Sequence, residues 1–203
     1  MTLHQKKYKN LYVKNTSFRI PIVDSDMGYN ESISVPEWMI QVDDILSSSI
    51  KNFENFSELY GWYSDRSRLT KGRTANNLFS TSAIQHSNVL AVLPAGIYFP
   101  TLENKMNRGT NISFVLLVRL TNVGQTREIQ QIILYTDCKI ESIQQQLDEI
   151  IVSFRPESCT NIIFKYTQQA VLEGQSVSFY DYVKGKNLYG KLEFSKDFIK
   201  VSL

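Results

Sequence analysis

A short stretch that mixes basic and aromatic side chains is the first place where this sequence offers chemistry. Residues 60–73 read YGWYSDRSRLTKGR and contain four cationic and three aromatic side chains. Arginine and lysine neutralise phosphates, and tyrosine and tryptophan rings stack on unpaired bases. The stretch therefore predicts a contact with nucleic acid or with a protein partner. The residues that would make this contact are Tyr60, Trp62, Tyr63, Arg66, Arg68, Lys71 and Arg73.

Two other roles fit the same stretch. Trp62 and its neighbours can anchor a loop to the core while the cations are simply solvated. A loop of this composition can also become ordered on an anionic membrane surface or on a protein. All of these interpretations stay open at the level of sequence.

Residues for catalysis or for a cofactor are sparse and unpatterned. The two cysteines, Cys138 and Cys159, form no CxxC pair, and the two histidines, His4 and His86, stand far apart in the chain. Zinc sites need such residues at short spacings, so we expect no metal site, and we expect both thiols to be free. The sequence also lacks a glycine-rich phosphate loop and a GxSxG motif. We therefore expect no cofactor and no catalytic residue.

An enzyme whose site is assembled from distant residues is an alternative. Asp24 and Asp26 form a DxD pair, which can hold a metal beside a phosphate-bearing substrate, although turn formation explains the pair as well. Together with Arg66, Arg68 and His86 they would make such a site. An enzymatic role stays open, and a non-enzymatic one is favoured.

The composition is that of one well-packed domain. The chain has 203 residues, of which 42% are hydrophobic and 12% aromatic, and its formal net charge is +2. A domain of this size buries a core without disulfides or metals, and so small a charge excludes a protein that coats nucleic acid by electrostatics alone. We expect a single α+β domain over residues 1–203, with a long polar loop at about 57–88 that is either functional or mobile.

Two segments show the periodicity of amphipathic helices. Apolar residues recur at spacings of three and four within 36–56, after a capping box at 34–37. The same spacing appears within 140–154, and Arg155 and Pro156 follow it. The spacing predicts helices at about 36–56 and 140–154.

The remaining apolar segments predict strands. Residues 112–120 are apolar on both faces, which indicates a central strand covered on each side. A turn at 122–126 and the apolar run 129–135 would complete a hairpin. Further strands are predicted at 11–23, 89–99 and 162–166, with a polar turn at 103–109. Residues 188–194 and 198–201 predict a terminal hairpin around a turn at 195–197. We expect a mainly antiparallel sheet built from hairpins, with the two helices packed on it.

The N-terminus predicts neither secretion nor a membrane anchor. Its residues MTLHQKK are basic, but no apolar run follows them. The longest apolar stretches are far shorter than the roughly 20 residues with which a helix crosses a bilayer. We therefore expect an intracellular protein, cytoplasmic or nuclear, that is not secreted and has no transmembrane segment.

The favoured function is that of a non-enzymatic structural or interaction protein. It would act by self-association or by binding another protein, as a viral matrix or coat protein does, with the loop 57–88 as its contact arm. The alternatives are a nucleic-acid-binding protein that uses residues 60–73 and an enzyme acting on a phosphate-bearing substrate. The expected partners are a second copy of the chain, another protein and, through residues 60–73, nucleic acid or an anionic membrane surface.

Overall fold

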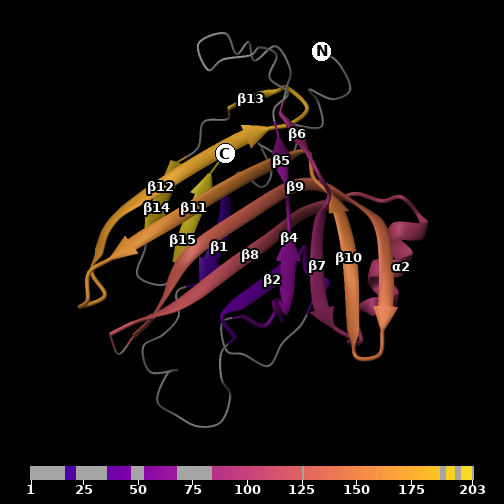
Figure 1. Ribbon diagram of the computed structural model, residues 1–203, viewed down its shortest axis with the longest axis horizontal. Coiled ribbons are helices and arrows are strands. Elements are labelled where there is room, and N and C mark those ends of the chain that lie inside the picture. The colour runs from indigo at the N-terminus through magenta and orange to yellow at the C-terminus, as the bar shows by residue number, and fades with distance from the viewer. Residues whose placement is uncertain are drawn as a thin grey trace, which may run out of the picture.

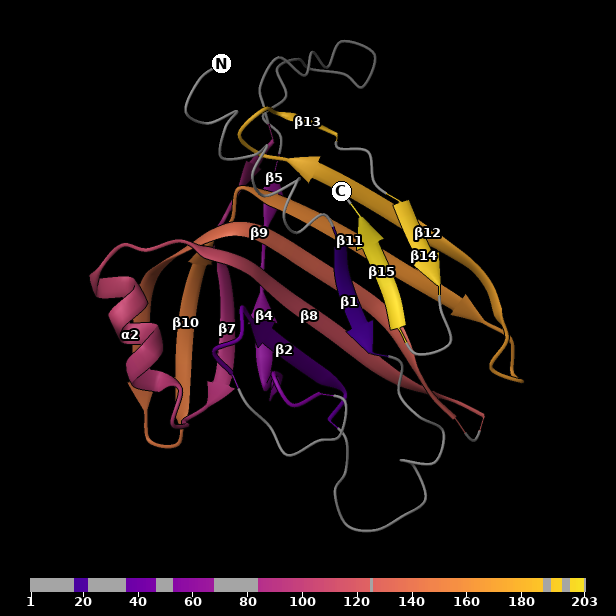
Figure 2. The same ribbon diagram turned by 180° about the vertical axis from the view of Figure 1, so that it is seen from behind.

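Antiparallel strands dominate the architecture of this chain. The computed structural model describes residues 17–21, 36–46, 53–67, 84–124, 126–187, 191–194 and 198–202. In them, a ten-stranded sheet is accompanied by a three-stranded sheet and a two-stranded pair (Figures 1 and 2). The elements are β1 (Ser17–Pro21), β2 (Trp38–Val42), β3 (Ser57–Glu58), β4 (Gly61–Tyr63), β5 (Arg66–Ser67), β6 (Gln85–His86), β7 (Val89–Pro94), α2 (Phe99–Asn107), β8 (Ile112–Val123), β9 (Thr126–Gln146), β10 (Glu149–Arg155), β11 (Ser158–Tyr166), β12 (Leu172–Asp181), β13 (Lys186–Asn187), β14 (Lys191–Phe194) and β15 (Phe198–Ser202).

The long strand β9 is the spine of the main sheet. Its first part pairs with β8 and β11, and its last part pairs with β10. Within the part that pairs with β10 lies a β-bulge: Ser153 is opposite Ser142, but Phe154 is opposite Ile140, so Glu141 is an extra residue in β9. A bulge bends its strand and increases the local twist. Figure 1 shows β9 curving from its neighbours β8 and β11 toward β10, which divides the sheet into two halves.

Two apolar cores lie on opposite faces of β8 and β9. Val115 and Leu117 belong to the larger core, together with Leu102 of α2 and with side chains of β7 and β10. Leu116 and Val118 belong to the second core. This burial on both faces confirms the prediction that residues 112–120 form a central strand covered on each side. The predicted hairpin is also confirmed, because β8 pairs with β9 from Val123 opposite Thr126 onward.

The helix predicted at about 36–56 is wrong where the structure describes this segment. Residues 38–42 are β2, which pairs with β8. The chain then turns at Asp43, where φ is 44° and the carboxylate Oδ1 accepts a hydrogen bond of 3.0 Å from the backbone N–H of Phe114. Met39 and Ile40 face different cores, so β2 is apolar on both faces and lacks the alternation that marks a half-buried strand. Ser34, the expected helix cap, lies outside the described residues.

The helix predicted at about 140–154 is also wrong, because this segment is the hairpin of β9 and β10. The bulge at Glu141 places Ile140 and Ile143 on one face at a spacing of three residues, which resembles a helical spacing. Leu147, which would lie in the apolar stripe of such a helix, is instead in the turn of the hairpin. It is 95% exposed and has a φ of 49°.

The only α-helix of the described part of the chain lies where a strand end and a polar turn were predicted. This helix, α2, has a proline in its first turn, which suits a helix start because its φ is already fixed. Leu102 is its one buried residue. Phe99 and Met106 pack against the same core and lie three residues before and four residues after Leu102, so the sequence contained a short helical spacing that was interpreted as a strand end and a turn.

Other predicted strands are confirmed where they are described. β11 covers the prediction at 162–166, and β14 pairs with β15 as the predicted terminal hairpin. β1 lies within the prediction at 11–23, whose other residues are outside the described ranges. The described ends of the predicted loop 57–88 contain the short strands β3 to β6. No helix in the described ranges is long and apolar enough to span a bilayer.

Candidate functional site

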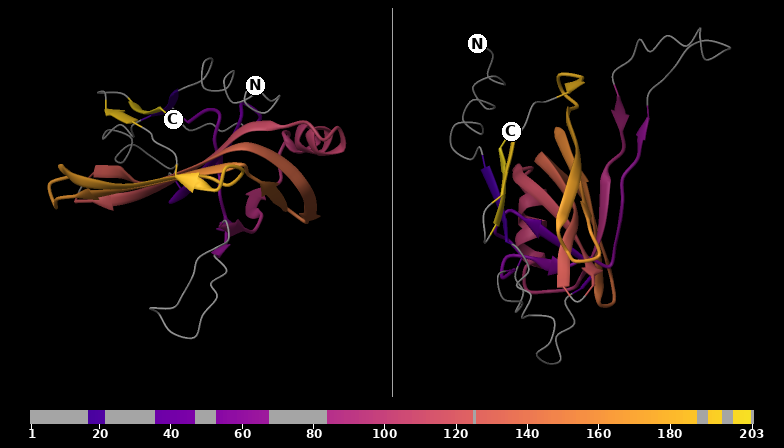
Figure 3. Two further views of the ribbon diagram at one scale, coloured as in Figure 1. Left: turned by 90° about the horizontal axis from the view of Figure 1, so that it is seen from above. Right: turned by 90° about the vertical axis from the view of Figure 1, so that its left-hand side faces the viewer.

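A two-stranded arm leaves the main sheet at the segment that the sequence singles out. β5 and β6 pair, with Arg66 opposite His86, and they project away from the sheet (Figure 3). They leave from β4 and return to β7, which are themselves paired strands. We call residues 64–67 and 84–88 the arm root. The arm is therefore an excursion between two neighbouring strands of the sheet.

The described residues of the predicted contact stretch fall into two groups. Tyr60 and Tyr63 have exposed rings, at 52% and 58%. Trp62 packs toward the core, with its ring centroid 5.5 Å from that of Trp38. The Arg66 guanidinium donates from Nη2 to Cys159 Sγ at 2.9 Å, so it fastens the arm to β11. Tyr60 and Tyr63 are thus the described members of the stretch that are best placed to contact a partner.

The other predicted contact residues cannot be compared with the structure. Arg68, Lys71 and Arg73 lie outside the described residues, so a nucleic-acid contact through these cations stays a prediction. Asp24 and Asp26 of the alternative enzyme site lie outside them as well. Among the described residues, no group of three or more His, Cys, Asp or Glu side chains is arranged to hold a metal ion.

Backbone and side-chain hydrogen bonds close the base of the arm. The backbone N–H of Asp65 donates to Ser87 Oγ at 2.9 Å, and the backbone N–H of Ser87 donates to the Asp65 carbonyl at 2.9 Å. His86 lies beside this pair, with its ring centroid 3.8 Å from that of Tyr182. The arm root is therefore held both across its own strands and against the end of β12.

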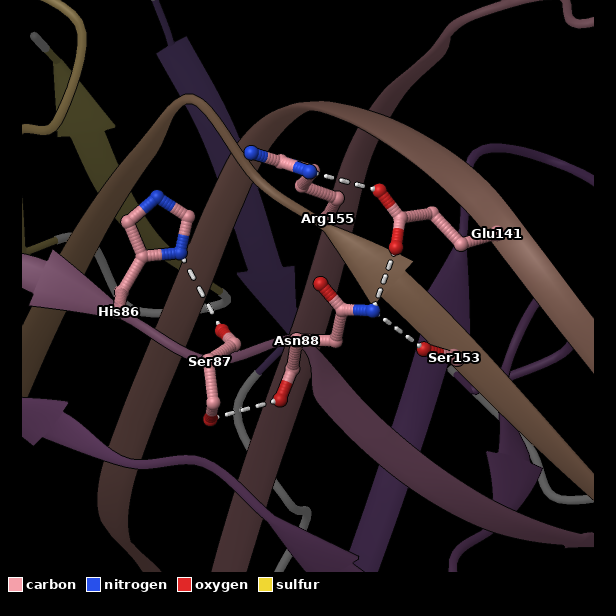
Figure 4. A network of polar contacts seen from close by, with 6 residues as sticks. All are labelled: His86, Ser87, Asn88, Glu141, Ser153 and Arg155. Carbon is pink, nitrogen blue, oxygen red and sulfur yellow. Dashed lines mark hydrogen bonds and ion pairs between the residues drawn. The ribbon is translucent and has the colours of Figure 1, made fainter.

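Asn88 connects the arm root to the bend of the sheet (Figure 4). Its Nδ2 donates to Glu141 Oε2 at 2.7 Å and to Ser153 Oγ at 3.0 Å, while Arg155 Nη1 donates to Glu141 Oε1 at 3.1 Å. The hydrogen bonds from Asn88 and then Arg155 hold the pKa of Glu141 below its ordinary value. One amide thus joins β7 to the bulge of β9 and to β10.

We expect Asn88→Ala to lower the free energy of unfolding by about 1–3 kcal/mol, because the hydroxyl of buried Ser153 would lose its partner. Urea unfolding measures the loss. Asn122→Ala, at the exposed end of β8, is the matched control and should change stability by less than about 0.5 kcal/mol. Equal effects of the two substitutions would contradict the assigned role of Asn88.

The two cysteines are buried free thiols, as predicted. Burial raises the pKa of Cys159 to about 11 and raises that of Cys138 well above its ordinary value. Only the thiolate is an effective nucleophile, so neither residue is prepared for covalent catalysis at neutral pH. The contacts of the arm root, including that of Arg66 with Cys159, therefore serve to anchor β5 and β6 to the rest of the fold.

No local pattern marks the residues that build this anchor. Asn88 is separated by 53 residues from Glu141 and by 65 from Ser153. Asn88 precedes β7, Glu141 lies in β9 and Ser153 lies in β10, and no local spacing links these three polar residues. Of the residues grouped in the alternative enzyme site, the structure brings Arg66 and His86 together as cross-strand partners.

Comparisons with known proteins find similarity at the level of structure. No family model matches the sequence, and no curated protein matches it. A structure described as that of a type six secretion system protein has a TM-score of 0.66 at 13% identity, and the match covers 76% of this chain and 100% of that chain. Hcp1 from Salmonella typhimurium has a TM-score of 0.58 at 16% identity, with 74% and 97% covered. A type VI secretion system effector from Yersinia pestis has a TM-score of 0.53 at 18% identity, with 71% and 98% covered.

These matches correct two expectations from the sequence. The expectation of an intracellular protein that is not secreted is contradicted, because the fold is that of secretion-system proteins, one of them described as an effector. The viral matrix or coat protein was the wrong analogy, because the named sources are bacteria. The chain has an Hcp-like fold, shared over nearly the full length of each of these solved chains.

Proposed function

We propose that this chain is a non-enzymatic structural subunit of a bacterial type VI secretion system. In this proposal copies of the chain self-associate into hexameric rings, and the rings form a secreted tube. The observation that carries the proposal is the Hcp-like fold, which matches solved secretion-system chains over 97–100% of their length. The proposal refines the self-association that the composition already favoured.

An uncharged sheet face supports self-association. Tyr63 of β4 and Leu90 of β7 are direct cross-strand neighbours, and so are Val92 of β7 and Ile151 of β10. We call these four residues the uncharged face. Tyr63 and Leu90 are 58% and 38% exposed, and Val92 and Ile151 are half-buried. Protein interfaces are enriched in aromatic residues and depleted of charge at their centres, which is the composition of this face.

The arm supplies a second surface, distinct from the uncharged face. A closed ring of identical subunits needs two different surfaces on each subunit, one for each neighbour. β5 and β6 project away from the main sheet (Figure 3), whereas the residues of the uncharged face belong to strands of that sheet. We propose that the arm is a contact element of the assembly.

The mass of the assembled protein tests this proposal. Light scattering on the purified chain at neutral pH should give about six times the 23.4 kDa of one chain at micromolar concentrations. The mass should fall toward that of one chain on dilution. A concentration-independent mass of one chain would contradict self-association, and a stable dimer would contradict the ring.

A further inference from the structure

His86 lies in the arm root, where the charge of its ring affects the packing against Tyr182. Its ring packs on the ring of Tyr182, which directly follows β12, and its Nδ1 lies 3.2 Å from the carbonyl oxygen of Ser87. A carbonyl only accepts hydrogen bonds, so Nδ1 carries the proton in the neutral ring. Nε2 is then the atom that gains a proton on acidification.

The charged groups around His86 disfavour that second proton. Arg66 is its cross-strand partner on β5, and Arg155 lies at the end of β10 (Figure 4). Glu141 of β9 is the acid of the network beside His86, but Arg155 and Asn88 already donate hydrogen bonds to it. Burial lowers the pKa of His86, the hydrogen bond to Ser87 opposes this, and the positive charges of Arg155 and Arg66 lower the pKa further.

We propose that the arm root is a pH-sensitive latch, in which neutral His86 holds β5 and β6 against the end of β12 and protonated His86 releases them. Releasing the arm root lets the charged ring leave Tyr182 and move into water, away from Arg66 and Arg155. Arg66 and His86 are cross-strand partners. Arg66 contacts Cys159 and His86 stacks on Tyr182, so release of the paired strands breaks both contacts together.

The direction of the pH effect follows from proton linkage. A histidine in a released arm has an ordinary pKa of about 6.5, and the docked histidine has a lower one. The released state therefore binds more protons, so docking is favoured above about pH 6.5 and weakens as the pH falls below it. One proton limits the change to about tenfold in the opening equilibrium per pH unit. Below the pKa of His86 in the docked state, the opening equilibrium no longer changes with pH.

The consequence for assembly rests on the proposed function, whereas the latch itself does not. If the arm contacts neighbouring subunits, acidification would weaken that contact by releasing its root. Hydrogen exchange at the arm root measures the latch whether or not rings form. Failure of the latch is therefore distinguishable from failure of the proposed ring assembly.

Hydrogen exchange measured by mass spectrometry at about pH 7 and pH 5 tests the latch. Protection of the amides of Asp65 and Ser87, corrected for intrinsic exchange, should fall several-fold toward pH 5 in the unaltered chain. His86→Phe keeps a ring on Tyr182 but cannot be protonated, so its protection should stay constant. His4→Gln is the matched control, because His4 is the only other histidine, and it should behave like the unaltered chain.

Two results would overturn the latch. One is protection at the arm root that does not change between pH 7 and pH 5 in the unaltered chain. The other is a fall in protection that persists in His86→Phe, which would assign the pH effect to another group. Arg155→Gln adds a graded check: removing this cation raises the pKa of His86 toward its ordinary value, so the fall in protection should become smaller.

Discussion

Tyr63→Lys should convert the assembled protein into single chains. The substitution places a positive charge on the uncharged face, where an assembled neighbour would have to desolvate it without a partner. The loss of a central aromatic contact costs about 2 kcal/mol or more, which weakens each subunit contact about 30-fold. Light scattering at a fixed micromolar concentration should therefore give the mass of one chain instead of a ring.

The fold of the Tyr63→Lys chain should remain intact, because the side chain is 58% exposed. Its urea midpoint should therefore stay close to that of the unaltered chain. Leu147→Lys introduces the same charge at a position that is 95% exposed and outside the uncharged face. This control should still form rings. If both variants or neither variant lost assembly, the uncharged face would not be the contact surface.

Val152→Asp should prevent folding. Val152 is 0% exposed in the larger core, where it lies between β7 and β9. An unpaired carboxylate at such a position costs several kcal/mol, which is most of the stability of an average domain. The milder Val152→Ala should remain folded and lose about 2 kcal/mol in urea unfolding. Circular dichroism of the soluble fraction measures the first change.

Leu147→Asp is the matched control for Val152→Asp, and it distinguishes the hairpin from the helix that the sequence suggested. In a helix over 140–154, Leu147 would lie in the buried stripe and Val152 would lie outside it. In the hairpin, Leu147 occupies the exposed turn between β9 and β10. Leu147→Asp should therefore change stability by less than about 0.5 kcal/mol. Unfolding of this variant, with tolerance of Val152→Asp, would contradict the strand assignment.

The hairpins that could be predicted are those in which two apolar runs flank a short polar turn. Residues 112–120 and 129–135 are apolar runs of strand length joined by a short polar turn, and two such runs around a turn indicate a hairpin. The hairpin of β8 and β9 was therefore predictable. The terminal hairpin of β14 and β15 was predictable for the same reason.

The two wrong helices share a physical cause. A spacing of three or four residues indicates a helix only if the chain has no bulge or turn within the window. The extra residue Glu141 and the turn at Leu147 produced this spacing within 140–154, and the turn at Asp43 followed β2 in the first segment. Both Asp43 and Leu147 have a positive φ, which is uncommon for residues other than glycine and marks a turn rather than a helix.

The candidate site was predictable only in part. The mixture of aromatic and basic residues at 60–73 pointed to the place where the arm leaves the sheet, and Tyr60 and Tyr63 are exposed there. The anchor that holds the arm was not predictable. Asn88, Glu141 and Arg155 meet because β10 pairs with both β9 and β7, and a single sequence does not report contacts over such separations.

Electron microscopy of the purified chain is the most direct test of the central claim that it is a ring-forming secretion-system subunit. Images of the unaltered chain at neutral pH should show rings with six-fold symmetry, and concentrated samples should show rings stacked end to end. Tyr63→Lys should show no rings. Single globular particles at every concentration of the unaltered chain, or a closed dimer, would contradict the account.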